Sequence, residues 1–212
     1  MSINNYKLKL KYIFPVFLTI YLYSHNSCSS GSSKENNIEA IQKKEMEATN
    51  KMYQNTGKLI SGFEFKLKAT KEQEKEWSDG YIPWISLSNP ESQIKQLVDA
   101  DEKIIKYQTI NIIFDYPLNN PAIFEFKNSN YFSRKDLILA ISKKYHEIYN
   151  EEEKSSKIKT IPLDERTGII NRNETQGKYG IWGHDLSDLD LSSIEVYETD
   201  EGKINILLII ES

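Results

Sequence analysis

Residues 203–211, KINILLIIE, decide the fold class. Apolar side chains occupy both alternating faces of this run: Ile204, Ile206, Leu208 and Ile210 on one, Leu207 and Ile209 on the other. A short run that is apolar on both faces is typical of a strand in the middle of a sheet, covered on each side by helices or loops. The sequence therefore predicts a central strand here.

Three further strands are expected from the same period-two pattern. Residues 194–196 form a short strand, and a turn at 199–202 leads from it into the central strand. Upstream, residues 110–116 and 124–127 alternate apolar and polar side chains, and the sequence PLNNP at 117–121 separates them. Five connecting residues with this composition favour a hairpin.

A helix is predicted between the two pairs of strands. Ser133 followed by Asp136 is a capping-box pattern. Behind it, apolar residues lie on one helical stripe: Leu137, Ile138, Ile141, Tyr145, Ile148 and Tyr149. The three glutamates at 151–153 oppose the helix dipole, so we expect that end of the helix to fray.

Several weaker elements precede these strands. They are a helix at 37–56, a strand or alternatively a helix at 62–68, a short helix opened by Thr70 and Gln73, an aromatic loop or edge segment at 78–88, and a helix that starts at Asn89-Pro90 and buries Ile94, Leu97 and Val98. The order of all these elements predicts an α+β fold with a largely antiparallel sheet and N-terminal helices.

Composition limits the class of protein. Of the 212 residues, 39% are hydrophobic and 27% are charged, as in soluble globular domains. Residues 28–212 carry 24 basic and 31 acidic side chains, a net charge of −7. This balance argues against a nucleic-acid partner, because phosphate recognition needs a basic surface. The single cysteine excludes an intrachain disulfide framework and a cysteine-based zinc site.

The first 27 residues have the pattern of a secretory signal peptide. Lys7, Lys9 and Lys11 precede the apolar run YIFPVFLTIYLY at 12–23. As a helix, twelve residues would rise about 18 Å, well short of the roughly 30 Å hydrocarbon core of a bilayer. An uncleaved anchor or a buried helix is the alternative interpretation.

The only cysteine, Cys28, directly follows this leader in the sequence SHNSC at 24–28. This arrangement resembles a bacterial lipoprotein signal. The resemblance implies that the chain is cleaved after Ser27, that the Cys28 sulfur is diacylated, and that the protein lies in the cell envelope, attached to a membrane on its periplasmic or surface side. Ordinary cleavage that leaves a free thiol is the alternative. Residues 28–36 then form a flexible tether, and residues 37–212 a single α+β domain.

Residues 171–191 are the unusual segment. Three of the nine glycines fall within it, at 177, 180 and 183, which predicts positive φ angles or close backbone approach. We expect Trp182 to fix this segment on the core. The candidate binding residues are Asn171, Arg172, Asn173, Thr175, Tyr179, Trp182, His184, Asp185 and Asp188. Irregular backbone rich in such residues is where binding sites commonly lie.

No cofactor or metal is predicted for this segment. His184, Asp185 and Asp188 could ligate a metal, but the only other histidine after the leader, His146, is expected on the solvent side of its helix. The aspartates could instead bond backbone amides in tight turns. His184 could act as a general base, although no serine or cysteine nucleophile has a recognisable setting.

Other motifs in the chain give no stronger chemistry. The glycines do not match a phosphate-binding loop, and HEIYNEEE at 146–153 lacks the second histidine of a zinc protease. Arg172 could receive a carboxylate or phosphate, or it could tie the segment to a neighbouring carbonyl or carboxylate.

The sequences DYPL at 115–118 and NRNETQGKYGIWGHDLSDL at 171–189 resemble an uncharacterised family of exported domains, over about residues 80–212. The resemblance implies no activity and no site residue. The predicted anchor, the acidic balance and the absence of a convincing catalytic constellation lead us to expect a non-enzymatic envelope lipoprotein that binds an envelope protein or a small ligand. The alternatives are an envelope hydrolase or metal-dependent enzyme that uses His184, Asp185 and Asp188, and a purely structural envelope protein.

Overall fold

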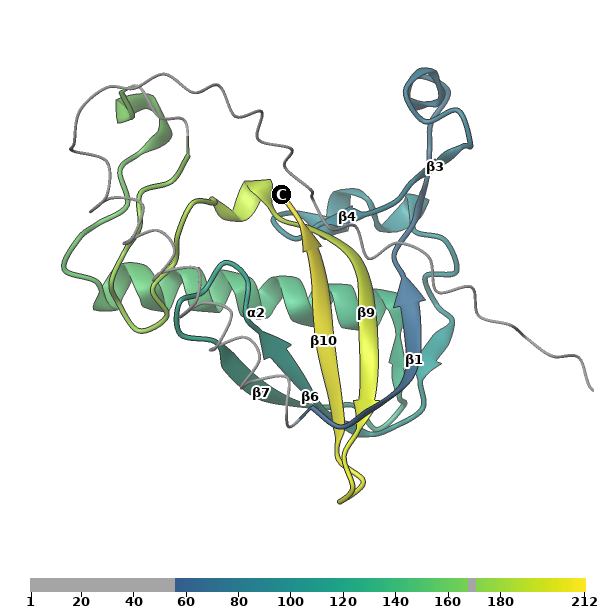
Figure 1. The fold of residues 1–212 in the computed structure, drawn as a ribbon. Helices are drawn as coiled ribbons and strands as arrows, with labels where there is room; N and C mark the ends of the chain where they lie inside the picture. The colour runs from purple at the N-terminus through teal and green to yellow at the C-terminus, as the bar shows by residue number, and fades with distance from the viewer. Residues whose placement is uncertain (1–55, 168–170) are drawn as a thin grey trace, which may run out of the picture. The chain divides into compact units, whose positions relative to one another are not determined.

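The computed structural model describes residues 56–167 and 171–212 (Figure 1). The predicted signal peptide, Cys28 and the tether lie outside these residues, as does the predicted helix at 37–56 except for its last residue. The described part of the chain is α+β, with one α-helix and a dominant mixed sheet.

The main sheet places the C-terminal strand at its centre. Its order is β1-β9-β10-β6-β7, and the short strand β4 pairs with β9. These strands are β1 (Lys58–Glu64), β4 (Ile85–Ser86), β6 (Thr109–Phe114), β7 (Ala122–Lys127), β9 (Asp190–Glu198) and β10 (Ile204–Glu211). β10 runs parallel to β6, and the other pairings are antiparallel. The parallel pairing requires a long connection between the two strands, and the helix lies within it.

The register of β10 explains its composition. Ile206 is paired with Val196 on one side and with Ile112 on the other, and all three are buried in the core. On the opposite face, Leu207 is also buried, whereas Ile209 is half-buried. The predicted central strand is therefore confirmed, with its second face covered in part.

The helix α2 (Arg134–Ser155) begins as the capping box predicts. Ser133 Oγ accepts a hydrogen bond from Asp136 N at 3.1 Å, and Ser133 N donates to Asp136 Oδ2 at 2.9 Å. The predicted stripe lies against the core, with Tyr149 only half-buried. Tyr145 packs edge-on to Phe114 of β6, with ring centroids 5.0 Å apart, so α2 covers one face of the sheet (Figure 1).

The hairpin predicted at 110–127 is confirmed. β6 and β7 pair along their whole length, and Ile112 lies opposite Phe124. The turn predicted at 199–202 is also present, with Gly202 N donating to Thr199 O at 2.8 Å.

The helix predicted after Asn89-Pro90 is wrong. Two 3₁₀ turns form instead, η2 (Pro90–Ser92) and η3 (Ile94–Gln96), and the Asn89 side chain makes no capping hydrogen bond. The chain extends at Leu97, which pairs with Leu67, and Val98 N donates to the carbonyl of residue 66. This pairing with a distant segment wins over local helix propensity.

The remaining elements are short. They are β2 (Leu67–Lys68), η1 (Gln73–Lys75), β3 (Tyr81–Ile82), β5 (Lys103–Ile105), β8 (Phe132–Ser133), η4 (Leu163–Glu165) and η5 (Leu186–Asp188). The strand interpretation of residues 62–68 is correct for β1 and β2, with a break at residues 65–66. Within residues 56–167 and 171–212, no helix combines the length and apolar character needed to span a bilayer.

Candidate functional site

The segment 171–190 is held by pairing with a neighbouring turn and by pairing within itself. On one side, Ile181 forms a bridge with Leu118, and Gly180 O accepts from Asn119 N at 2.9 Å. Within the segment, Thr175 N donates to Ile181 O at 2.9 Å, and Arg172 forms a bridge with Gly183. The segment is therefore an irregular ribbon held by the 117–120 turn.

Glu152 of α2 forms the floor under this ribbon. Its carboxylate is fully buried and accepts backbone N–H groups from Gly177 at 2.7 Å, Tyr179 at 2.7 Å and Gly180 at 3.1 Å. Burial by itself raises the pKa of Glu152, but these bonds and one from the Thr175 side chain outweigh it, and the pKa is lowered. The carboxylate is thus held as an anion.

The prediction that α2 frays at residues 151–153 is wrong. The helix continues to Ser155. The reason is that Glu152 is stabilised by donors on the ribbon, and Glu153 accepts from Thr160 N and Oγ1 at 3.2 and 2.9 Å. Specific hydrogen bonds exceed the unfavourable contact with the dipole, which is worth less than about 1 kcal/mol at the surface.

The three glycines are required for two different structural reasons. Gly180 and Gly183 have φ angles of +64° and +67°. At Gly177 a Cβ would lie 2.6 Å from Ser155 Oγ and 2.7 Å from Glu152 Oε2. The predicted mixture of positive φ and close approach is confirmed.

Three rings meet beside the ribbon. The Trp182 ring contacts Tyr116 edge-on at a centroid distance of 5.2 Å and His184 at 5.7 Å. Tyr116 Oη lies 2.7 Å from His184 Nε2 and 2.7 Å from Ser212 Oγ. We call Tyr116, Trp182 and His184 the aromatic cluster.

The prediction that Trp182 fixes the ribbon on the core is wrong. Its side chain is 36% exposed, whereas Tyr179 and Ile181 are buried. Alternation places Ile181 toward the core and its neighbour Trp182 outward. The aromatic cluster consequently presents part of its surface to solvent.

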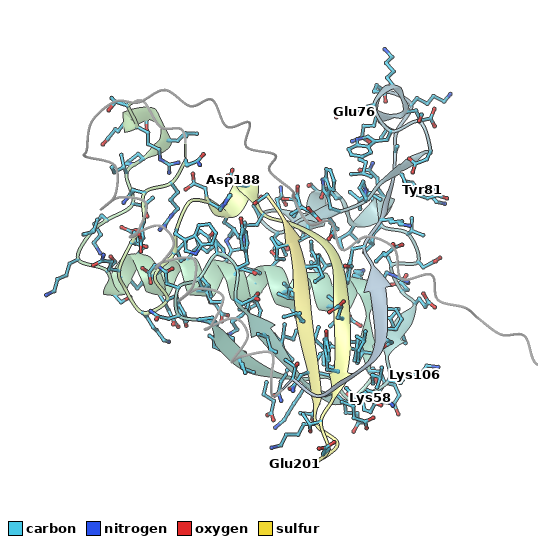
Figure 2. All side chains as sticks on the ribbon, in the orientation of Figure 1. Lys58, Glu76, Tyr81, Lys106, Asp188 and Glu201 are labelled. Carbon is cyan, nitrogen blue, oxygen red and sulfur yellow. The ribbon has the colours of Figure 1, made fainter. Side chains whose placement is uncertain are left out.

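Both candidate aspartates already bind groups within the protein. Arg166 donates to both carboxylate oxygens of Asp185 in a bidentate ion pair, with Nη1–Oδ2 at 2.7 Å and Nη2–Oδ1 at 3.0 Å. Asp188 caps η5 by accepting from Asp185 N at 2.8 Å (Figure 2). Within the described part of the chain, no group of three or more His, Cys, Asp or Glu side chains could hold a metal ion.

Arg172 and Thr175 are buried, and Asn173 is half-buried. Arg172 donates to Ile181 O at 3.1 Å and to Thr160 Oγ1 at 2.6 Å, and burial lowers its pKa. Asn173 accepts from Ile161 N at 2.8 Å. These contacts favour the interpretation in which Arg172 ties the segment to its neighbours, whereas Asn171 is exposed.

Sequence reasoning missed three residues of the site. The sequence patterns place Tyr116 at a strand end and Glu152 at a frayed helix end, and they give Arg166 no role. An Arg followed by an Asp nineteen residues later carries no recognisable signal. Arg166 follows η4 and Asp185 precedes η5, so their pairing depends on the three-dimensional arrangement of these two turns.

The other histidine contributes to a different place. His146 Nε2 contacts Ser88 O at 3.0 Å, and its side chain is exposed, as its helical position predicts.

Comparison of the chain with protein-family models, curated proteins and solved structures finds no match. The similarity to an uncharacterised exported family stays a prediction.

Proposed function

We propose that this protein is a lipid-anchored protein of the cell envelope that binds a partner through the aromatic cluster. The observation that carries this proposal is an exposed Trp182 on a ribbon whose Arg172, Asp185 and Asp188 side chains are already engaged within the protein. Such a surface can bind without first breaking its own structure.

The physical argument is pre-organisation. The hydrogen bonds to Glu152 and the Arg166–Asp185 ion pair already fix the conformation of the ribbon. Little conformational entropy is therefore lost when a partner binds. Tryptophan and tyrosine are enriched among the residues that dominate binding energy, because they bury a large area with few rotatable bonds. An envelope protein or a small ligand with an apolar face fits this surface.

Site-specific photocrosslinking in cells tests the binding role. A photocrosslinker at position 182 is expected to give a defined adduct, and Tyr116→Ala is expected to reduce it. Position 81 is a matched control, because Tyr81 is 41% exposed and lies on an arm separate from Asp188 and the ribbon (Figure 2). Equal adducts at both positions would contradict the proposal.

A hydrolase is the second candidate, favoured by the hydrogen-bonded chain from Ser212 Oγ through Tyr116 Oη to His184 Nε2. In this candidate, His184 serves as a base through Tyr116. Asp185 is not available to orient it, because both carboxylate oxygens bind Arg166. Loss of turnover of an envelope-derived ester or amide in His184→Ala, with folding intact, would favour the hydrolase over the binding protein.

The lipid anchor is tested separately by mass spectrometry. The membrane fraction is expected to contain an N-terminal peptide that begins at an acylated Cys28. A mature protein that starts elsewhere, or carries an unmodified Cys28, would contradict the anchor and leave the role of the aromatic cluster to be judged by crosslinking.

A further inference from the structure

The main sheet ends in two edge strands that differ in how well they are protected against pairing. β1 has a bulge between Leu59 and Ser61, and Glu64 O accepts a hydrogen bond from Arg134 Nε at 3.2 Å. β7, at the opposite end of the strand order, pairs with β6 in an unbroken register (Figure 1). It contains neither proline nor glycine. Proteins commonly disrupt their sheet edges with bulges, prolines or covering groups, so a regular edge strand is a template for a further strand.

The hydrogen bonds of β7 show which of its backbone groups are open. Asn128 N donates to Gln108 O at 2.9 Å, one position beyond the paired strands, so alternation assigns the even-numbered residues of β7 to bonds with β6. The N–H and C=O groups of Ile123, Glu125 and Lys127 therefore point away from β6. Within the described residues, no strand pairs with this side of β7. Three residues thus present main-chain donors and acceptors at the spacing that another strand needs.

Two charged side chains of this edge are complementary to their own copy. Glu125 and Lys127 are 54% and 71% exposed, with Lys127 Nζ 2.8 Å from Glu125 Oε1. Because they lie two positions apart, a two-fold axis at Phe126 would place Glu125 of each copy directly opposite Lys127 of the other. Opposite charges in such positions stabilise a strand pair, whereas an axis at residue 125 would place two glutamates against each other. A lysine normally discourages edge pairing, but in the register at 126 each lysine meets a glutamate.

The same register covers exposed aromatic surface. Phe124 and Phe126 pack against Phe114 with ring centroids 5.7 and 6.4 Å apart, yet both remain only half-buried at the end of the sheet. Phe126 of the two copies would form a non-hydrogen-bonded pair, the type with the closer Cα atoms, about 4.5 Å apart. Aromatic pairs in this position add to the stability of a sheet.

We propose that β7 pairs antiparallel with β7 of a second copy of this chain, about a two-fold axis at Phe126. A two-fold interface must be complementary to itself, as the Glu125 and Lys127 positions are, whereas a partner of different sequence needs no such symmetry. The pairing depends neither on the lipid anchor nor on the binding role proposed above. It would join two ribbons in one assembly, because the 117–120 turn that leads into β7 also holds the ribbon.

Charge exchange between co-produced copies tests the pairing. Full-length chains with two different C-terminal tags are made in the same cells, and capture through one tag measures the recovery of the other from a detergent extract. The variants are Glu125→Lys and Lys127→Glu, each of which breaks the ion pair within the strand. Glu64→Lys and Lys66→Glu are the matched controls, because they break an ion pair of 2.6 Å at the opposite edge of the sheet.

We expect wild-type copies to be recovered together. Either variant of β7 combined with itself should lower recovery at least about fivefold, because both cross-strand pairs become repulsive. Glu125→Lys combined with Lys127→Glu should restore recovery, since opposite charges again face each other although neither copy regains its internal ion pair. A mixture that is no better than the single variants overturns the proposal. Equal recovery in all combinations, no recovery of wild type, or a similar loss in the controls also overturns it.

Disulfide trapping in intact cells tests the register without detergent. In a Cys28→Ser background with a mild oxidant added, Phe126→Cys should give a cross-linked dimer, because Cα atoms about 4.5 Å apart are within disulfide reach. Ile123→Cys is the control, since residue 123 is 57% exposed but would lie roughly 20 Å from its own copy in this register. A dimer through position 123 and none through position 126 overturns the proposed register.

Discussion

The carboxylate of Glu152 accepts the backbone N–H of Tyr179 at 2.7 Å, across 27 positions of sequence. This contact joins the last turns of α2 to the ribbon that carries the aromatic cluster. The same carboxylate binds the N–H groups of Gly177 and Gly180. One side chain thus organises residues 177–180 of the irregular backbone, and we expect its loss to destabilise the whole ribbon.

Glu152→Ala is expected to cost at least about 2 kcal/mol of unfolding free energy, because three N–H donors lose a buried acceptor. Glu152→Gln should cost less, although its amide N–H₂ faces a backbone donor. Glu151→Ala is the matched control. Its ion pair with Lys178 is half-exposed, so its loss should cost under about 1 kcal/mol. Urea titrations of the three variants measure this. Equal losses at 151 and 152 would refute the organising role.

The lowered pKa of Glu152 predicts an acid-sensitive ribbon. Because the folded-state pKa lies below the ordinary value of 4.5, the charged carboxylate stabilises the fold above about pH 4.5. That contribution is lost as the pH falls through the lower folded-state value. The difference in stability between wild type and Glu152→Gln should therefore shrink between about pH 6 and about pH 3. A constant difference across this range would show that the charge of Glu152 contributes nothing.

The glycines of the ribbon should respond unequally to alanine. A Cβ added at Gly183 would meet no atom within 4 Å. Gly183→Ala should therefore cost only the backbone strain of a φ of +67°, about 1 kcal/mol of unfolding free energy. Gly202→Ala in the β9–β10 turn has the same character and is the control. Gly177→Ala should cost more, because its Cβ would displace the Glu152 carboxylate. Thermal melts that rank Gly177→Ala as the mildest of the three would contradict the close approach.

Periodicity was sufficient for the elements that form the core. Alternation located β6, β7, β9 and β10, and the Ser133–Asp136 pattern located the start of α2. These signals are local and are reinforced by burial of one face. The turn at Asn89-Pro90 was misassigned because the pairing of Leu67 with Leu97 joins residues thirty positions apart, which no local pattern encodes.

The candidate site could be located from sequence but not built. Glycine density identified the ribbon correctly, since Gly180 and Gly183 adopt positive φ angles and Gly177 has no room for a Cβ. The partners that hold the ribbon, Glu152 and Arg166, lie on other elements and have no spacing rule that links them to it. Ionisable residues of this kind are normally surface residues, so composition gave no reason to bury them.

Alanine substitutions at two neighbouring residues of β10 should show how tightly each face of the strand is packed. Leu208 is buried against the core, and Leu208→Ala is expected to cost about 2–5 kcal/mol. Ile209 points to the opposite face and is half-buried, so Ile209→Ala should cost about half as much. Equilibrium unfolding in urea gives both values. A larger loss at Ile209 would mean that the second face of the sheet is the more tightly covered one.

Alanine substitutions at Ile181 and Trp182 should separate an effect on stability from an effect on binding. Ile181 is fully buried, so Ile181→Ala is expected to cost about 2–5 kcal/mol and to loosen the ribbon. Trp182→Ala should cost less than the roughly 3 kcal/mol of a buried tryptophan, because 36% of the side chain is already in solvent. If the aromatic cluster binds a partner, Trp182→Ala should nevertheless abolish the photocrosslink formed from a probe placed at position 116. Unfolding curves and crosslinking of the same preparations distinguish the two effects. A Trp182→Ala variant that unfolds as readily as Ile181→Ala would assign the ring a structural role and remove the main support for a binding surface.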